Sequence, residues 1–416
     1  MCYRFGEFEL HPSERELRHK GEPIALAPKA FDALQHLVRR APHLVRKDEL
    51  MDALWPSTHV EEANLTNCIA ALRKVLGHGG IQTVSRHGYR LMLTVTGEPG
   101  IISGAYEKFV DARDLIRERS PESILRARDL LWLCLADDPT FAPAWAWLGR
   151  CSWMIEKLSA DGERAEALAE AAFRRAFIID PDLACAHQFY TPVETDMGHA
   201  QLALSRLSDR LARIRRDPET FTGLVQVFRF CGLLQESIDA HHRAQELDPT
   251  ISTSVPHTLF LIGDYPAAID TYAGRAGYYL DAAVWAALGE TRRSVALLRE
   301  RLGRAQLSHL MSGLTASLLA VLEQRTAEAI DLMQRINIRH EPEATMYLAR
   351  HYSYLGAADE AIGMLRQAAA AGFICAPETL RRDPWLAAVR AHPHYRQIEA
   401  EAQKAVMRAR SVLQTG

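Results

Sequence analysis

Residues 64–91 read NLTNCIAALRKVLGHGGIQTVSRHGYRL, and this stretch decides how the N-terminal part of the chain folds. Its first half has the period of an amphipathic helix, with four apolar residues on one face: Leu65, Ile69, Leu72 and Leu76. The opposite face and its flanks carry small, amide and cationic side chains: Thr66, Asn67, Ala70, Ala71, Arg73 and Lys74. The second half predicts a β-hairpin over residues 81–93, with its tip near residues 86–88.

Basic charge is concentrated on this same stretch. Residues 1–98 contain 13 Lys and Arg against 12 Asp and Glu. Residues 64–97, in contrast, contain no acidic residue and four basic ones: Arg73, Lys74, Arg86 and Arg90. Small side chains allow a helix to approach DNA closely, amides read base edges, and cations bind phosphate or guanine, so this helix suits a major groove. The alternative is that Arg73 and Lys74 are only the solvated side of an amphipathic helix.

The flanking residues predict a small mixed domain. Alternating apolar and polar residues over 3–26 predict short strands. A helix is expected to open at Pro28, whose missing N–H is unpaired in a first helical turn anyway, and to end before Pro42. A second short helix is expected over residues 50–55, and Asn64 is the expected N-cap of the third. The first 96 residues therefore predict a sheet, three helices and a hairpin.

Three motifs in this domain occur in the order and spacing of a known family. They are Leu54-Trp55, then Ile69-x-x-Leu72-Arg73-x-x-Leu76, then Thr83-Val84 followed by Gly88-Tyr89-Arg90. Over residues 3–94 the chain closely resembles the OmpR/PhoB-type winged helix. The resemblance implies that the helix near 63–76 is a recognition helix and that the hairpin tip is a wing. It also implies DNA contacts from the helix front named above and, on the wing, from Arg86, His87 and Arg90.

Two departures from the family pattern leave the DNA target open. Many relatives have Gly where this chain has Arg86, and many carry a long polar residue where it has Ala70 or Ala71. Fewer long side chains imply weaker direct base readout, or reading of thymine methyl groups.

Residues 105–410 show helical periods and Ala-rich packing, without the alternation of strands. Asp-Pro pairs at 138–139, 180–181, 217–218 and 248–249 are each expected to close an Ala-rich segment. A 34-residue helix–turn–helix template fits residues 218–251 and 342–375 without gaps. A third fit, from Trp145 to Pro181, needs about eight extra residues in its central turn. These stretches resemble tetratricopeptide repeats (TPRs), with six to eight helix pairs expected; an irregular helical array is the alternative.

The predicted fold is mainly α: a small α+β winged helix-turn-helix domain followed by an all-α TPR-like solenoid. The expected domains are residues 1–96, a linker over 97–104, repeats over 105–380 and capping helices over 381–416. No membrane-spanning run and no secretory leader are predicted. With a winged helix starting at Met1 and no receiver domain before it, the architecture is most similar to the HilA-like regulators.

Other chemistry has little support in the sequence. The seven cysteines are dispersed, as expected for reduced thiols, and no nucleotide-binding or nucleophile motif occurs, so no catalytic residue and no cofactor are expected. The histidine pairs at 241–242 and 392–394 favour structural roles over a metal site, and no metal is expected. Trp147 and Trp153 are candidates for a partner or effector groove, although helix packing is favoured for this aromatic cluster.

The sequence therefore predicts a cytoplasmic bacterial transcription regulator that is not an enzyme. Its expected partners are promoter DNA, and a protein or small-molecule effector or a second copy at the repeats, with no membrane contact. The alternative is an interaction scaffold whose winged helix binds a partner such as RNA polymerase, through residues 56–62, in place of DNA. The operator, the effector, the sign of regulation and the oligomeric state stay open.

Overall fold

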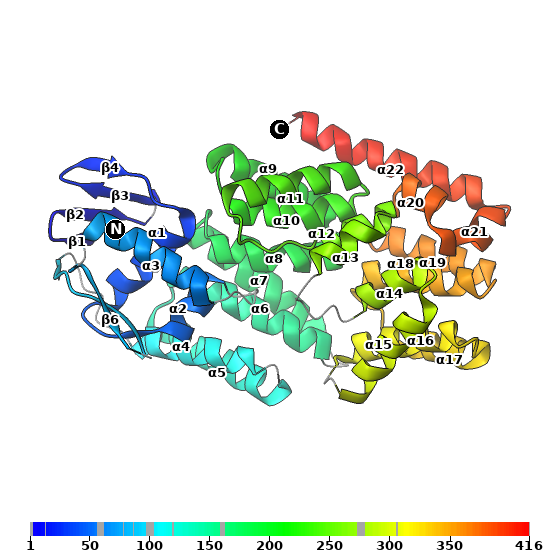
Figure 1. The fold of residues 1–416 in the computed structure, drawn as a ribbon, viewed down its shortest axis with the longest axis horizontal. Helices are drawn as coiled ribbons and strands as arrows, with labels where there is room; N and C mark the ends of the chain where they lie inside the picture. The colour runs from blue at the N-terminus through cyan, green and yellow to red at the C-terminus, as the bar shows by residue number, and fades with distance from the viewer. Residues whose placement is uncertain are drawn as a thin grey trace. The chain divides into compact units, whose positions relative to one another are not determined.

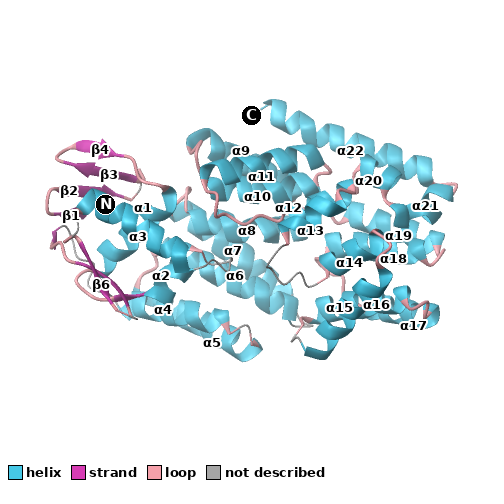
Figure 2. Ribbon diagram, viewed as in Figure 1, coloured by secondary structure: helices cyan, strands magenta, loops and turns pink. Residues whose placement is uncertain are grey.

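The computed structural model describes residues 3–12, 14–55, 62–77, 79–85, 87–96, 104–118, 120–158, 163–272, 279–304 and 307–415. The chain divides into two compact units. Residues 1–141 and 248–252 form unit 1, and residues 142–247 and 253–416 form unit 2. Figure 2 shows that the strands lie in the N-terminal part of the chain, whereas helices make up the rest of the described residues.

Unit 1 begins with an antiparallel sheet. Its strands, in spatial order, are β4 (Glu22–Ile24), β3 (Glu16–His19), β2 (Phe8–His11), β1 (Tyr3–Phe5) and β8 (Val95–Thr96). The alternation predicted from the sequence is real, because Phe5, Leu10 and Leu17 are buried while Arg4 and Glu7 are exposed.

Helices α1 (Pro28–Arg40), α2 (Lys47–Leu54) and α3 (Glu62–Leu76) follow the sheet. Pro28 is the first residue of α1, as expected. A second sheet has the order β5 (Val45–Arg46), β7 (Gly88–Leu91) and β6 (Ile81–Val84). Apolar residues from both sheets and all three helices form one core. The predicted N-cap at Asn64 is wrong, because α3 already begins at Glu62.

Two further helices group with this domain in unit 1: α4 (Gly104–Arg117) and α5 (Pro121–Asp137). Ser120 caps α5 in a reciprocal pair with Ser123, which satisfies the first backbone N–H groups. The guanidinium of Arg40 in α1 lies 5.6 Å from the ring centre of Tyr106 in α4. The predicted linker falls on residues of which 97–103 lie outside the described part, so that boundary stays a prediction.

Unit 2 is a series of antiparallel helix pairs (Figure 1). In chain order its paired helices are α6 (Ala142–Leu158), α7 (Glu163–Ile179), α8 (Ala184–Asp196), α9 (Ala200–Arg213), α10 (Pro218–Phe230), α11 (Leu234–Leu247), α12 (Val255–Ile262), α13 (Tyr265–Thr271), α14 (Leu280–Ala287), α15 (Thr291–Arg304), α16 (His309–Leu322), α17 (Thr326–Arg335), α18 (Pro342–Tyr354) and α19 (Ala358–Ala370). With α4 and α5, the described residues contain eight pairs, as the sequence predicts, and their arrangement is TPR-like.

Small residues lie where two helices of a pair cross. A Cβ atom at Gly149 in α6 would come within 2.7 Å of the Phe173 ring in α7, so this crossing requires glycine. The corresponding Ala244 and Ala368 are fully buried. These template positions from the sequence are therefore confirmed as packing sites.

Two details of the repeat prediction are wrong. The extra residues of the third repeat lengthen the helices instead of the turn: α6 and α7 have 17 residues each, whereas α10 and α11 have 13 and 14. The pair Asp217-Pro218 opens α10 instead of closing α9, which ends at Arg213. Proline is compatible with a first helical turn, so the same dipeptide can end one segment and start another.

The chain ends in α20 (Pro377–Arg382), the 3₁₀ helix η1 (Pro384–Leu386), α21 (Ala387–Ala391) and α22 (Tyr395–Thr415). Helix α22 packs on α9, α19, α20 and α21, so it lies along the helix pairs of its own unit (Figure 1). Its Val406 side chain packs against Gly232, in the turn between α10 and α11. A Cβ atom added at Gly232 would lie only 2.9 Å from that side chain.

Candidate nucleic-acid interface

Helix α3 has a buried and an exposed face, as the sequence predicts. The apolar residues Leu65, Ile69, Leu72 and Leu76 are buried in the core of the winged helix. Along the other side Thr66, Asn67, Ala70 and Lys74 are exposed, while Ala71 and Arg73 are half-buried. These six side chains follow helical spacing along one side of the helix, and we call this surface the α3 front.

Arg73 links the recognition helix to the hairpin. Its guanidinium donates from Nε and Nη2 to the carbonyl oxygen of Ile81, at 3.2 and 3.0 Å, and from Nη2 to Oγ1 of Thr83 at 2.5 Å. The Arg of the second motif thus binds the Thr of the third. In this arrangement Arg73 fixes the position of β6 against α3, a role that spacing along the sequence does not reveal.

Gly88 is required where the hairpin meets β5. In the β5–β7 pairing Arg46 lies opposite Gly88 and Val45 opposite Tyr89. A Cβ atom at position 88 would lie 1.9 Å from the carbonyl oxygen of Val45, a backbone atom that has no room to move. The amide N–H of Lys47 donates to the carbonyl of His87 at 3.0 Å. The base of the hairpin is therefore fixed on one side by β5 and on the other by Arg73.

The tip of the hairpin is short and exposed. Ser85 and His87 are exposed, and Nδ1 of His87 lies 2.8 Å from the carbonyl oxygen of Ser85. Arg90 is half-buried on β7. Arg86, the third predicted wing residue, lies outside the described residues. The described part of the tip thus presents the imidazole of His87 and the hydroxyl group of Ser85 to solvent.

Carboxylates of the winged helix pair with cations that lie away from this surface. Glu7 pairs with Lys20, Glu16 with Arg18, and Asp32 with Arg15. In the described part of the domain no carboxylate pairs with Arg73, Lys74 or Arg90. Cations without an acidic partner are available to a phosphate backbone.

One ion pair does lie at the start of α3. Lys47 pairs with Glu62, and this hydrogen bond raises the pKa of Lys47. Glu62 lies in the first helical turn, where a carboxylate interacts favourably with the helix dipole. Lys47 and Thr83 are the residues near this surface that sequence reasoning missed. Thr83 belongs to the third motif and could have been found from it, whereas Lys47 has no such signal.

Other residues singled out in the sequence lie elsewhere. The rings of Trp147 and Trp153 are both buried, the first 4.9 Å from Phe189 and the second 5.4 Å from His340. His241 bonds to Thr253, and His392 to Asp359. Of residues 56–62, the loop expected to contact polymerase, only Glu62 is described.

None of the helices in the described part of the chain combines the length and the apolar character that crossing a membrane would require.

The sequence of the winged helix is similar to known transcriptional regulators. Residues 21–91 match the family described as "Transcriptional regulatory protein, C terminal". The transcriptional activator CadC of Escherichia coli K12 is 31% identical over 98 residues, which are 22% of this chain and 19% of CadC. The transcriptional regulator HilA of Salmonella typhimurium is 34% identical over 90 residues, which are 21% of this chain and 16% of HilA. The chain thus spans less than a fifth of either relative.

Among solved structures, the DNA-binding domain of E. coli CadC is similar to this chain at 30% identity and a TM-score of 0.22, covering 23% of this chain and 94% of that one. The family match contains all three motifs, whereas strands β1 to β3 lie before its first residue. The N-terminal domain therefore belongs to the OmpR/PhoB-type family of winged-helix domains found in transcriptional regulators, and TPR-like helix pairs follow it in the sequence.

Proposed function

We propose that the chain is a sequence-specific, DNA-binding transcriptional regulator of the cytoplasm, and that it has no enzymatic activity. The observation that carries this proposal is the α3 front, an exposed helix surface with amide, small and cationic side chains in a domain of this family. In its support, the domain of the relative CadC whose structure is known is a DNA-binding domain. A helix of this kind reaches base edges only in the major groove.

The side chains of the α3 front have different roles in this proposal. Asn67 reads a base edge through its amide, and Ala70 and Ala71 let the helix approach and contact thymine methyl groups. Thr66 and Lys74 bind phosphates, as do His87, Arg90 and Arg86 from the wing. Arg73 positions the wing, and its positive charge adds to the attraction between this surface and the DNA phosphates.

The repeats are proposed to set when or where the regulator acts. TPR-like helix pairs stack into surfaces that bind extended partners, so this part binds a protein or small effector or joins two copies of the chain. We keep the predicted domain division at residues 1–96, 97–104, 105–380 and 381–416 as part of this proposal.

The test is genome-wide chromatin immunoprecipitation combined with DNA binding by the purified full-length chain. Lys74→Ala should weaken binding to every bound site and reduce the slope of log K against log salt by about 0.9, because one phosphate contact is lost. Lys20→Ala is the matched control, because it removes a cation that is exposed and already paired with Glu7. Equal salt slopes for the two variants would contradict the assigned role of Lys74.

Asn67→Ala tests sequence reading separately. Loss of an amide contact to a base should cost roughly 1–3 kcal/mol at one base position and relax the preference there. An unchanged preference in a selection from random DNA would remove Asn67 from the interface. Discrete genomic sites that survive both Lys74→Ala and Asn67→Ala would instead favour recruitment through a partner such as RNA polymerase.

A further inference from the structure

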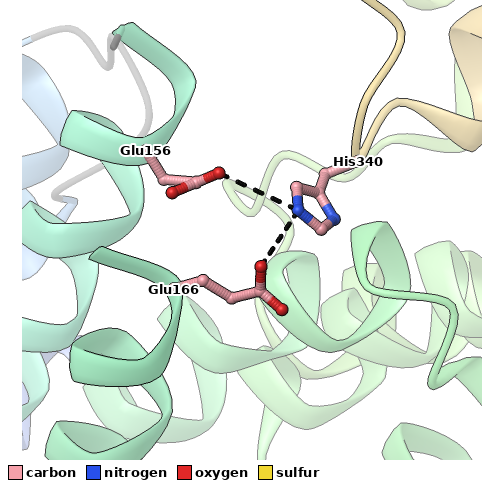
Figure 3. Close-up of side chains that lie close together, drawn as sticks. All are labelled: Glu156, Glu166 and His340. Atoms are coloured by element: carbon pink, nitrogen blue, oxygen red, sulfur yellow. Dashed lines mark ion pairs between the residues drawn. The ribbon is translucent and has the colours of Figure 1, made fainter. Parts of the chain in front are cut away.

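Three side chains that could bind a metal ion meet inside unit 2. Glu156 lies near the end of α6, Glu166 lies in α7, and His340 lies in the turn between α17 and α18. Figure 3 shows that both carboxylates point toward the imidazole ring from two adjacent helices. Their ligand atoms all lie within 4.8 Å of one another. Residues far apart in the sequence are thus brought to one point.

The separations between these atoms suit a metal ion. Nε2 of His340 lies 3.2 Å from Oε2 of Glu166 and 3.9 Å from Oε1 of Glu156. A tetrahedral ion with bonds of about 2.1 Å holds its ligand atoms about 3.4 Å apart. Small rotations of two side chains would therefore bring all three atoms to bonding distance.

Glu156 carries the strongest indication of a missing cation. Its side chain is only 4% exposed, and among the described residues no hydrogen-bond donor reaches Oε2. An unpaired buried carboxylate oxygen costs free energy, because the oxygen has lost its water without gaining a partner. A second carboxylate, Glu166, lies across the same gap. A dication would be neutralised by these two charges.

Lys157, the neighbour of Glu156 in the sequence, is engaged with other groups. Lys157 bonds to Asp196 at 2.8 Å, to Glu341 at 2.5 Å and to the carbonyl oxygen of His340 at 3.0 Å, so it fixes the backbone that carries the imidazole. Burial and the nearby Glu341 raise the pKa of Asp196 to about 7, although Lys157 opposes this. Among the described residues, the hydrogen bonds of Lys157 thus go to Asp196, Glu341 and the His340 backbone, and not to Glu156 or Glu166.

Arg339 already places a cation next to two of the three side chains, His340 and Glu166. Its Nε lies 3.2 Å from Nε2 of His340, and its Nη2 lies 3.5 Å from Oε2 of Glu166. This side chain is 45% exposed, so it can move into solvent. The guanidinium thus competes with an ion for His340 and Glu166.

We propose that Glu156, Glu166 and His340 form a binding site for a divalent transition-metal ion, such as Zn²⁺, within the repeat unit. One imidazole and two carboxylates suit ions of this class better than Mg²⁺ or Ca²⁺, which take oxygen ligands. Three protein ligands leave a position for water or for a donor atom of another molecule. The bound ion ties α6 and α7 to the turn before α18, so it stabilises the array across residues that are remote in sequence. The proposal does not depend on DNA binding.

The test uses the tag-free full-length chain, with Zn²⁺ measured by equilibrium dialysis and Co²⁺ absorption as a probe of the ligand set. Wild type should bind one ion per chain at this site, and Glu156→Gln should lower the affinity by at least about tenfold. Glu156→Gln removes the unpaired buried charge and keeps the shape, so a folded protein is expected, which circular dichroism verifies. Arg339→Ala should bind more tightly than wild type, because the competing guanidinium is gone.

The control is His394→Ala, which removes an exposed imidazole from the histidine pair at 392 and 394. It should leave the affinity unchanged, whereas His340→Ala should lower it as Glu156→Gln does. The proposal is overturned if Glu156→Gln binds Zn²⁺ as wild type does, or if wild type binds none. Equal affinity for Mg²⁺ and Zn²⁺ would contradict the assigned class of ion.

Discussion

The winged helix leaves its key cations at the surface, whereas the helix pairs of unit 2 bury theirs. Lys74 is exposed on α3, and no carboxylate in the described part of its domain pairs with it. In unit 2, Arg229 and Arg350 are almost completely buried, and each is paired with a carboxylate. Surface cations without partners can bind an external polyanion. Buried, paired cations instead hold parts of the protein together.

The buried pairs of unit 2 join elements that are distant in the chain. Arg229 in α10 donates to Glu343 in α18 at 2.9 and 3.2 Å. Burial alone would raise the pKa of Glu343, but Arg229 and His257 hold it well below its usual range. Arg350 in α18 donates to Asp383, the N-cap of η1, at 2.5 and 3.3 Å. In the repeats, buried ion pairs thus fix the relative positions of helices that are distant in the chain. In the winged helix, closely spaced sequence motifs have this role.

Removing one partner of a buried pair should give the largest effect. Asp383→Ala leaves the Arg350 guanidinium buried without its carboxylate and also removes the acceptor of the backbone N–H of Trp385. The free energy of unfolding should fall by roughly 3–5 kcal/mol, measured by urea unfolding of the full chain. Asp359→Ala is the control: its exposed carboxylate forms a surface pair with His392, so less than about 1 kcal/mol should be lost. Similar losses for the two variants would mean that burial of the pair is unimportant.

The winged helix should be broken by adding a single methyl group. Gly88→Ala places a Cβ atom against the carbonyl oxygen of Val45 and should separate β5 from β7. We expect a loss of roughly 1–3 kcal/mol and a marked loss of DNA affinity, since the wing loses its base. The control is Gly79→Ala, where the new Cβ meets nothing within 4 Å. Normal DNA binding by Gly88→Ala would show that the β5 contact does not position the wing.

The sequence predicts the winged helix well because its determinants are local. The four apolar residues of α3, the hairpin and the glycine at its base all lie within residues 64–91. An N-cap at Asn64 predicts Leu65 as the first residue of α3, three residues later than the observed start at Glu62. Asn64 is a good capping residue, but Lys47 from α2 binds Glu62 and favours an earlier turn, which only tertiary structure shows. The same holds for Arg73, whose contact with Ile81 requires the folded hairpin.

The repeats were predicted in outline, with errors where a template assumes constant lengths. The template places insertions in turns, whereas α6 and α7 keep their helical period through them and become longer. No spacing rule brings Glu156 and His340 together, because stacking of the helix pairs determines that contact. Contacts between buried charged residues of remote repeats are thus the feature of this molecule that cannot be predicted from the sequence.

Acid should weaken unit 2 through its buried histidines. His351 bonds to Tyr279 at 2.8 Å and to Ser317 at 3.2 Å, and burial lowers its pKa to about 3. In the unfolded chain the pKa is about 6.5, so stability is complete above that value and falls as the pH drops toward 3. The loss is about 1.4 kcal/mol per pH unit for one such group.

The measurement compares wild type with His351→Gln at pH 7.5 and 5.5. The variant should be less stable at pH 7.5 but should lose less stability on acidification. The difference between the two proteins decides the question, because Asp196, with its raised pKa, changes stability in the opposite direction over the same range. Parallel pH profiles would show that His351 does not contribute.

The smallest effect should separate positioning from charge in the winged helix. Thr83→Val keeps the shape of the side chain but removes the oxygen that accepts from Arg73, which should cost about 0.5–1.5 kcal/mol in the contact between α3 and β6. DNA affinity should fall about two- to tenfold, because the wing is held less firmly. The salt slope should stay as in wild type, since no cation is lost, whereas Lys74→Ala lowers it. Gln82→Val, at the neighbouring exposed position of β6, controls for the new apolar surface. A lowered slope in Thr83→Val would mean that Arg73 itself binds a phosphate in the wild type and needs Thr83 to hold it in place for that contact.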